Sequence, residues 1–284
     1  MLKQYYHLTK PGIIYGNLIT TSAGFLLASH AHFHFVLFIQ LLSSIALIIA
    51  SACVVNNVID RTIDAKMSRT QKRSLVTGDI STRAALMYAT FLALAGFTIA
   101  LQFLNTLTLF LGILAYFDYI VFYGITKRHS LHGTVVGSVA GALPPVAGYC
   151  AVTNHLDGGA LLLFLLLVFW QMPHFYAIAM YRFKDYKAAG LPVLPVKKGM
   201  RQTKIQILIY IAAFTITGAM FTVFGYTHIV FLLLMVMLGM SWLIKGVQGF
   251  SVTDDKKWAR GMFLHSLIVN LGMCLLLAVG ALLY

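Results

Sequence analysis

Hydrophobic residues form nine long runs along this 284-residue chain, separated by short polar connections. The runs are continuous and do not alternate with a period of two residues, which favours helices over the strands of a membrane barrel. A helix of about 20 apolar residues crosses a hydrocarbon core of roughly 30 Å. We therefore expect nine membrane-spanning helices, at residues 11–29, 35–59, 84–104, 106–125, 133–152, 160–180, 205–225, 228–245 and 260–283.

The composition supports this interpretation. The chain is 60% hydrophobic and 10% charged, with a mean hydropathy of +0.84, whereas about a quarter of the residues in a soluble protein are charged. We predict an all-α, polytopic membrane protein with one transmembrane domain over residues 1–284. The first run has a basic flank but no small-residue cleavage site after it, so we expect a retained helix. No soluble basic domain is left to bind nucleic acid.

Positive charges lie only in alternate connections. The segments 30–34, 105, 153–159 and 226–227 contain no lysine or arginine, and the other connections with the N-terminal segment hold all 21. The positive-inside rule then places the basic connections and the N-terminus in the cytoplasm, and the C-terminus outside. Orientation and contact with anionic lipids account for the net charge of +13. For a bacterium this predicts the cytoplasmic (inner) membrane.

A row of oxygen-bearing side chains stands where the second run ends. Asn56, Asp60 and Asp64 are spaced four residues apart, so they share one face if the helix continues past residue 60. Carboxylate and amide oxygens are suitable ligands for Mg²⁺. The alternative is a solvated helix end at which the acids pair with basic neighbours. These neighbours are Arg61, Lys66 and Arg69.

A second acid occupies the equivalent place after the sixth run. Asp185 lies in the basic segment 181–199, and the two clusters together hold three of the chain's eight acids. Because the clusters are four runs apart, we expect two four-helix pseudo-repeats plus a ninth helix around a central cavity, with the acids facing each other. Opposed acids among many cations are typical of a Mg²⁺–diphosphate site, since cations stabilise a diphosphate that leaves an allylic carbon. The candidate diphosphate-binding cations are Arg69, Arg73, Lys127, Arg128 and Arg182.

Several motifs in order then carry a family resemblance. NxxxDxxxD, the second Asp-bearing loop and nine helices resemble the intramembrane, UbiA-type prenyltransferase superfamily. Within it, the chain is similar to the protohaem IX farnesyltransferases, or haem O synthases, nearly from end to end. The motifs that carry this likeness are KPGIIYGN at 10–17, RTQKR at 69–73, KRHSLHGT at 127–134, GALPPVAGYC at 141–150, WQMPHFYAIA at 170–179, DYKAAGLPVLP at 185–195 and DDKKWAR at 254–260.

The resemblance implies a reaction and a ligand set. Farnesyl diphosphate would alkylate a vinyl group of haem B, and water would trap the resulting cation to give haem O. Asn56, Asp60, Asp64 and Asp185 would bind Mg²⁺ and diphosphate as the catalytic cluster. Many superfamily members carry DxxxD in the second loop, whereas here Tyr181 replaces the first acid and could only hydrogen-bond a phosphate. Membrane lipids, and a haem A synthase or terminal oxidase assembly pathway, are the further partners implied.

Histidine is the candidate residue for binding haem. His174 follows Pro173 inside the sixth run, and an ionisable residue at a broken membrane helix is a functional candidate. We expect His174 to be an axial iron ligand or a contact that orients the haem, with His129 and His132 as second choices. A hydrogen-bonded histidine of the helix bundle is the alternative. The cluster HAHFH at 30–34 lies on the outer side and reads as an interfacial loop.

Other features remain open at this stage. Asp118 lies inside the fourth run without an assigned role, and the small residues around Pro144 and Pro145 favour close helix packing or room for a flat macrocycle. The three cysteines lie in separate runs and read as packing residues. Competing functions are a prenyltransferase that acts on an aromatic quinone precursor, a secondary transporter and a non-catalytic haem-binding membrane protein.

Overall fold

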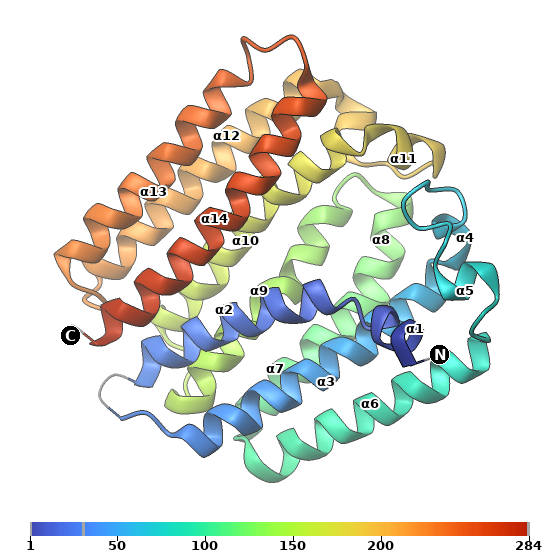
Figure 1. The fold of residues 1–284 in the computed structure, drawn as a ribbon. Coiled ribbons are helices and arrows are strands. Elements are labelled where there is room, and N and C mark those ends of the chain that lie inside the picture. The colour runs from blue at the N-terminus through green and yellow to red at the C-terminus, as the bar shows by residue number, and fades with distance from the viewer. Residues whose placement is uncertain (1, 30–31, 283–284) are drawn as a thin grey trace.

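The computed structural model describes residues 2–29 and 32–282, and all regular elements in this part of the chain are helices (Figure 1). The all-α prediction is therefore confirmed. In chain order the elements are α1 (Leu2–Leu8), α2 (Pro11–Ser29), α3 (Phe35–Ile59), α4 (Arg61–Asp64), α5 (Ser74–Thr77), α6 (Thr82–Phe103), α7 (Thr106–Phe117), the π-helix η1 (Asp118–Phe122), α8 (Tyr123–His129), α9 (Gly133–Thr153), α10 (Gly158–Tyr181), α11 (Phe183–Ala188), α12 (Leu194–Val223), α13 (Ile229–Gln248) and α14 (Asp255–Leu282).

Nine helices within the described residues are long and apolar enough to cross a membrane, with α7, η1 and α8 forming one of them. The tight connection before α7 is confirmed, since α6 ends at Phe103 and α7 begins at Thr106. Three predicted boundaries were wrong. The fourth span continues to His129, and the seventh and ninth begin at Leu194 and Asp255. The turns at these three helix ends contain several polar residues, so the hydropathy pattern alone places the ends too far inside the helices. The last predicted residue, 283, lies outside the described residues.

The nine spans of the described residues form two similar halves and one additional helix. The first half contains α2, α3, α6 and the span from α7 to α8, the second half contains α9, α10, α12 and α13, and α14 is the additional helix. In the first half α3 packs on α6, and in the second half α10 packs on α12 in the same way. The first helix of each half, α2 and α9, pack directly against each other (Figure 1). Helix α14 packs on both α2 and α13, which joins the end of the chain to its beginning. The predicted arrangement of two four-helix repeats plus a ninth helix is confirmed.

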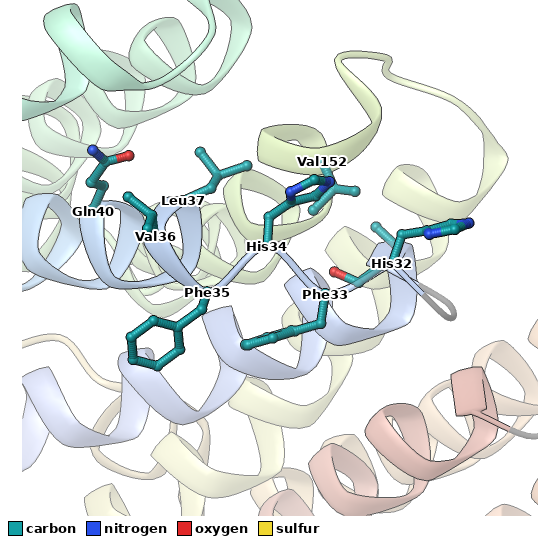
Figure 2. Close-up of a pocket in the computed structure, with 10 residues that line it drawn as sticks. His32, Phe33, His34, Phe35, Val36, Leu37, Gln40 and Val152 are labelled. Atoms are coloured by element: carbon teal, nitrogen blue, oxygen red, sulfur yellow. The ribbon is translucent and has the colours of Figure 1, made fainter.

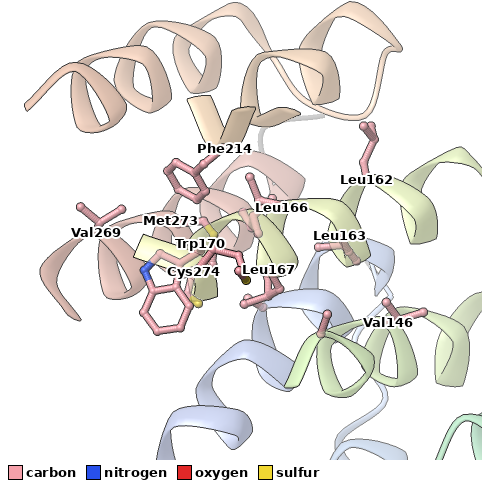
Figure 3. Close-up of a cluster of buried hydrophobic side chains, with 14 of the residues drawn as sticks. Val146, Leu162, Leu163, Leu166, Leu167, Trp170, Phe214, Val269, Met273 and Cys274 are labelled. Carbon is pink, nitrogen blue, oxygen red and sulfur yellow. The ribbon is translucent and has the colours of Figure 1, made fainter. Parts of the chain in front are cut away.

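The main apolar core surrounds α10. Figure 3 shows Leu166 and Trp170 of α10 near Phe214 of α12 and Met273 of α14, with Leu163 on the side of α10 toward Val146 of α9, and all of these side chains are buried. Because α10 is covered by helices on several sides, its sequence is apolar almost all round and shows no single hydrophobic face. Cys53, Cys150 and Cys274 are free and buried, as packing residues should be.

Glycines let α2 and α9 approach with their backbones nearly in contact. A Cβ atom at Gly24 would lie 2.0 Å from the carbonyl oxygen of Pro145, and one at Gly148 would lie 2.2 Å from that of Thr21. Backbone oxygens cannot move aside as a flexible side chain can. Close packing is therefore established at these two glycines of the interface.

The connection between α2 and α3 lies at the end of α3 opposite the acidic row. Phe33 packs on Phe25 and Phe38, which anchors the loop to the bundle. His32 and His34 line a pocket here together with Gln40, as Figure 2 shows. His30, the third histidine of the predicted interfacial loop, lies outside the described residues. The assignment of this loop to the membrane interface stays a prediction.

The glycine contact can be tested with a matched pair of substitutions in α2. Gly24→Ala should destabilise the protein by about 1–3 kcal/mol, because the added methyl group overpacks a rigid contact. Gly16→Ala is the control, since a Cβ atom there would meet nothing within 4 Å. Thermal unfolding in detergent micelles would compare the two. Equal melting temperatures for both variants would contradict the proposed packing.

Candidate functional site

The acidic row lies where α3 gives way to a short helical turn. Helix α3 ends at Ile59, Asp60 leaves helical geometry with a ψ of 2°, and α4 follows. The predicted end of the second span at residue 59 is confirmed, and the helix does not continue unbroken through residue 60. The helical spacing of Asn56, Asp60 and Asp64 is nevertheless kept. The Asp60 amide donates to the Asn56 carbonyl at 2.9 Å, and the Asp64 amide donates to the Asp60 carbonyl at 2.8 Å. Three oxygen-bearing side chains thus stay close along one chain segment.

Cations from distant segments neutralise both aspartates. The Lys127 ammonium lies 2.6 Å from one Asp60 carboxylate oxygen, and the Arg128 guanidinium lies 3.3 Å from the other. Arg73, just before α5, lies 2.6 Å from Asp64, whose side chain is only 7% exposed. Charges buried to this degree are costly unless they are paired. The row is therefore neither a solvated helix end nor paired with its immediate neighbours.

Lys10 supplies a further cation that the sequence analysis did not identify. It joins α1 to α2 with a φ of +53°, a left-handed conformation that usually falls to glycine after a helix. Its ammonium donates to Asn56 Oδ1 at 2.6 Å. The pKa of Lys10 is lowered to about 8, mainly by burial; the Arg73 and Lys127 charges contribute to the shift, and Cys53 and Asp60 oppose it. A strained, poorly neutralised cation at this place points to a role in binding.

Two buried donors at the row have no hydrogen-bond partner among the described residues. They are Asn56 Nδ2 and Arg128 Nε. An unsatisfied buried donor costs about 1–3 kcal/mol, so such groups usually mark a place where a ligand binds. Both belong to side chains that already contact the acidic row. The arrangement therefore favours an anion with several acceptor oxygens.

The second acidic loop meets the first at Asp185. The Ser68 hydroxyl and amide both donate to Asp185 Oδ1, at 2.7 and 3.2 Å, so the loops after α3 and α10 touch. In Figure 1, α11 and α4 accordingly lie on the same side of the bundle. Arg182 stacks over the Tyr181 ring at 4.5 Å. The expected proximity of the two loops is thus present, through a serine that the motifs did not single out.

Arg69 lies near this junction as well. Burial raises the pKa of the Tyr186 phenol, and Arg69 and Arg182 oppose that shift while Asp185 adds to it. The four side chains therefore share one neighbourhood at the same end of the two halves. The structure brings most of the predicted diphosphate-binding cations close to one of the acids.

A π-helix directs Lys127 toward Asp60. Residues 118–122 form η1, whose wider turn changes the face on which later side chains project. Tyr119 and Tyr123 stack with ring centroids 5.5 Å apart, and Lys127 lies 4.8 Å from the centre of the Tyr123 ring. Asp118 begins this turn and is buried, where it accepts a hydrogen bond from the Ala140 amide at 3.2 Å. It contacts α9 and has no ion-pair partner among the described residues.

The acids present suit a metal that binds together with its substrate. No three His, Cys, Asp or Glu residues within the described ranges converge on a point. Mg²⁺, however, commonly takes one or two carboxylates and completes its shell with phosphate oxygens and water. Asp60 and Asp64 offer hard oxygens, and the unpartnered donors beside them suit the phosphates. These residues therefore fit a shared site for Mg²⁺ and a diphosphate.

The candidate histidines lie in different environments. His174 is buried in α10, with Nδ1 2.7 Å from the Ser266 hydroxyl and its ring stacked on Trp170. His129 and His132 are exposed at the end of α8 and before α9, close in sequence to Lys127 and Arg128. The structure therefore does not bring the three histidines together. Ser266 lies in none of the motifs, and Lys10 begins the motif KPGIIYGN without having been assigned a role from it.

Comparisons with known proteins agree with this geometry. The model of the UbiA prenyltransferase family matches residues 17–268. The chain is 49% identical to the protoheme IX farnesyltransferase of Protochlamydia amoebophila over 95% of each protein, and 46% identical to that of Klebsiella pneumoniae over 98% of this chain and 95% of that protein.

Two solved structures share the fold. A digeranylgeranylglyceryl phosphate synthase superposes with a TM-score of 0.81 at 18% identity, over 100% of this chain and 99% of that one. A UbiA homolog from Archaeoglobus fulgidus bound to GPP and Mg²⁺ gives a TM-score of 0.71 at 16% identity, over 97% and 99% of the two chains.

The matched region includes the acidic row, Asp185, seven of the nine apolar spans in full and parts of the first and the ninth. The family resemblance seen in the motifs is therefore confirmed, and the protein is an integral membrane protein. The chain belongs to the UbiA prenyltransferase family.

Proposed function

We propose that this chain transfers the farnesyl group of farnesyl diphosphate to a vinyl group of haem B, with addition of water, to give haem O. The observation that carries the proposal is the acidic row surrounded by cations and open donors at the cytoplasmic ends of the helices. The choice of haem as acceptor rests on relatives about half identical to the chain that are called protoheme IX farnesyltransferases. Together these point to a prenyl diphosphate donor and a haem acceptor.

In this proposal Asn56, Asp60, Asp64 and Asp185 hold Mg²⁺ and the diphosphate. When bound, Mg²⁺ neutralises part of the negative charge that the diphosphate gains as its bond to the allylic carbon breaks. The support from structure is the hard-oxygen donor set described above, and the solved UbiA homolog bound to GPP and Mg²⁺ provides a precedent. The single acid of the second loop makes the metal depend mainly on Asp60 and Asp64.

The basic side chains would stabilise the leaving diphosphate. Lys127, Arg128 and Arg73 now contact carboxylates, and each can turn to a phosphate oxygen once the carboxylates bind metal. Arg69, Arg182 and Asp185 all lie close enough to Tyr186 to affect the pKa of its phenol, and Tyr181 offers a second phenol under Arg182. The vinyl carbon then forms the new carbon–carbon bond, and water adds to the resulting cation and releases a proton. The chain's part in these steps is to hold charge and orient the substrates.

His174 is our candidate axial ligand for the haem iron. Its side chain lies among aromatic rings in the membrane interior, where a porphyrin face would pack well. His129 and His132 are exposed at the aqueous edge and suit direct iron binding less well. We further propose that the active site and the N-terminus face the cytoplasm of a bacterium, with the C-terminus outside, because the Lys and Arg residues lie on that side.

The proposed reaction can be tested with purified protein. Incubation with haem B, farnesyl diphosphate and Mg²⁺ should yield haem O, identified by mass. The yield should fall to background when a chelator is added in excess and return when Mg²⁺ is restored. Product formation that is equal with and without the chelator would contradict the metal-dependent mechanism, and no product at all would contradict the assigned reaction.

A substitution at Asp60 serves as the site control in the same assay. Asp60→Asn keeps the shape of the side chain but removes the charge that binds metal, so turnover should fall by about 100-fold or more, as when one contact of a preorganised electrostatic site is lost. Membrane insertion should be unchanged, which fractionation would show. Wild-type turnover in the inserted variant would rule out this role for Asp60.

Lys10 should bind the diphosphate directly. Lys10→Met removes the cation but not the left-handed backbone, and should weaken binding of farnesyl thiolodiphosphate, an unreactive analogue, roughly 10- to 100-fold. Lys3→Met is the matched control, because Lys3 is an exposed lysine of α1. Calorimetric titration in the presence of Mg²⁺ would measure both. Equal affinities for the two variants would remove Lys10 from the site.

A further inference from the structure

Ser266 of α14 contacts both the His174 ring and Trp170, the residue on which that ring stacks. The Ser266 hydroxyl lies 2.7 Å from His174 Nδ1, and the Ser266 carbonyl accepts a hydrogen bond from Trp170 Nε1 at 2.8 Å. The Trp170 and His174 rings stack with centroids 4.8 Å apart and an interplanar angle of 25°. Ser266 thus fixes both aromatic side chains, which lie one helical turn apart on α10.

Counting protons assigns the direction of the Ser266–His174 hydrogen bond. The Ser266 hydroxyl has one proton and donates it to the Phe263 carbonyl at 2.6 Å, because a carbonyl can only accept. Toward His174 the hydroxyl must therefore accept, so His174 carries a proton on Nδ1. No carboxylate forms an ion pair with His174 in the described part of the chain, and an unpaired charge in an apolar core is costly. The ring is therefore neutral, with its lone pair on Nε2.

The Nε2 edge of the ring is free to bind a ligand. No described residue hydrogen-bonds this atom, and it is not among the enclosed polar atoms that lack a partner. A histidine that binds a metal usually donates its other ring N–H to a fixed acceptor, which sets the tautomer and strengthens the ligand. The contact between His174 and Ser266 has this form.

We infer that Ser266 is a positioning residue, which holds His174 as the Nδ1–H tautomer so that Nε2 can coordinate the iron of the haem substrate. This inference rests on the proposed function. It adds that α14, the ninth helix, takes part in the site through a side chain on a different helix from the metal and diphosphate residues. It also gives Trp170 a role, since the ring stacked on His174 limits rotation of the imidazole.

The test is resonance Raman spectroscopy of the purified protein with ferrous haem B, because the iron–imidazole stretch reports the hydrogen bond at Nδ1. Ser266→Ala should lower this frequency and weaken haem binding roughly 10-fold, the usual order for loss of a group that orients a metal ligand. Ser266→Thr should restore both, since a helical threonine can also donate to the preceding turn. Ser138→Ala is the matched control, because Ser138 is fully buried and donates to the Val135 carbonyl in the same way.

His174→Ala separates this inference from the proposed function. Loss of the iron–imidazole band in His174→Ala, together with an unchanged band and affinity in Ser266→Ala, would overturn the role of Ser266 and leave the haem ligand in place. A band that persists in His174→Ala would overturn both the ligand and its positioning residue. A shift in Ser138→Ala equal to that in Ser266→Ala would also overturn the inference, because it would show a general packing effect.

Discussion

The architecture at the end of the bundle that carries the acidic row depends on neutralising Asp60 and Asp64. Each carboxylate is matched by a cation from another part of the chain: Lys127 and Arg128 from α8, and Arg73 from the loop before α5. Lys10 adds a fourth cation through Asn56. A lone buried charge here would be costly. These contacts therefore fix α3 and α8 relative to one another, together with the segment before α5 that carries Arg73 and the connection between α1 and α2 that carries Lys10. The residues of the candidate site therefore also hold these separate segments of the fold together.

The same network is well suited to binding a metal with a diphosphate. Carboxylates and cations that now pair with each other can exchange partners, with the carboxylates turning to Mg²⁺ and the cations to the phosphates. The positive charge of Mg²⁺ would then pair with the carboxylates, and the negative charge of the diphosphate would pair with the basic side chains, so that no charge is left unpaired. The donors of Asn56 and Arg128 that lack partners, and the poorly neutralised Lys10, indicate where the additional acceptors would lie. Asp185 and Ser68 close the other side of this region.

Local sequence patterns predicted the nine-helix fold and the closeness of the three residues in the acidic row. Continuous apolar runs give the nine spans, and the four-residue spacing of Asn56, Asp60 and Asp64 places the acids together because it matches a helical turn. Ser266 and Lys10, although Lys10 begins the motif KPGIIYGN, were not identified as candidates because what marks each is a tertiary contact, to His174 and to Asn56, that no local pattern records. The π-helix that begins at Asp118 was missed for a related reason, since one widened turn leaves the apolar run unchanged.

A structure of the protein with farnesyl thiolodiphosphate and Mg²⁺ tests the exchange of partners most directly. The ammonium of Lys127 lies 2.6 Å from a carboxylate oxygen of Asp60. Our account predicts that this pair and the Arg73–Asp64 pair separate in the complex, with the aspartates on the metal and the cations on phosphate oxygens. Both ion pairs intact, with the diphosphate bound elsewhere, would contradict the account.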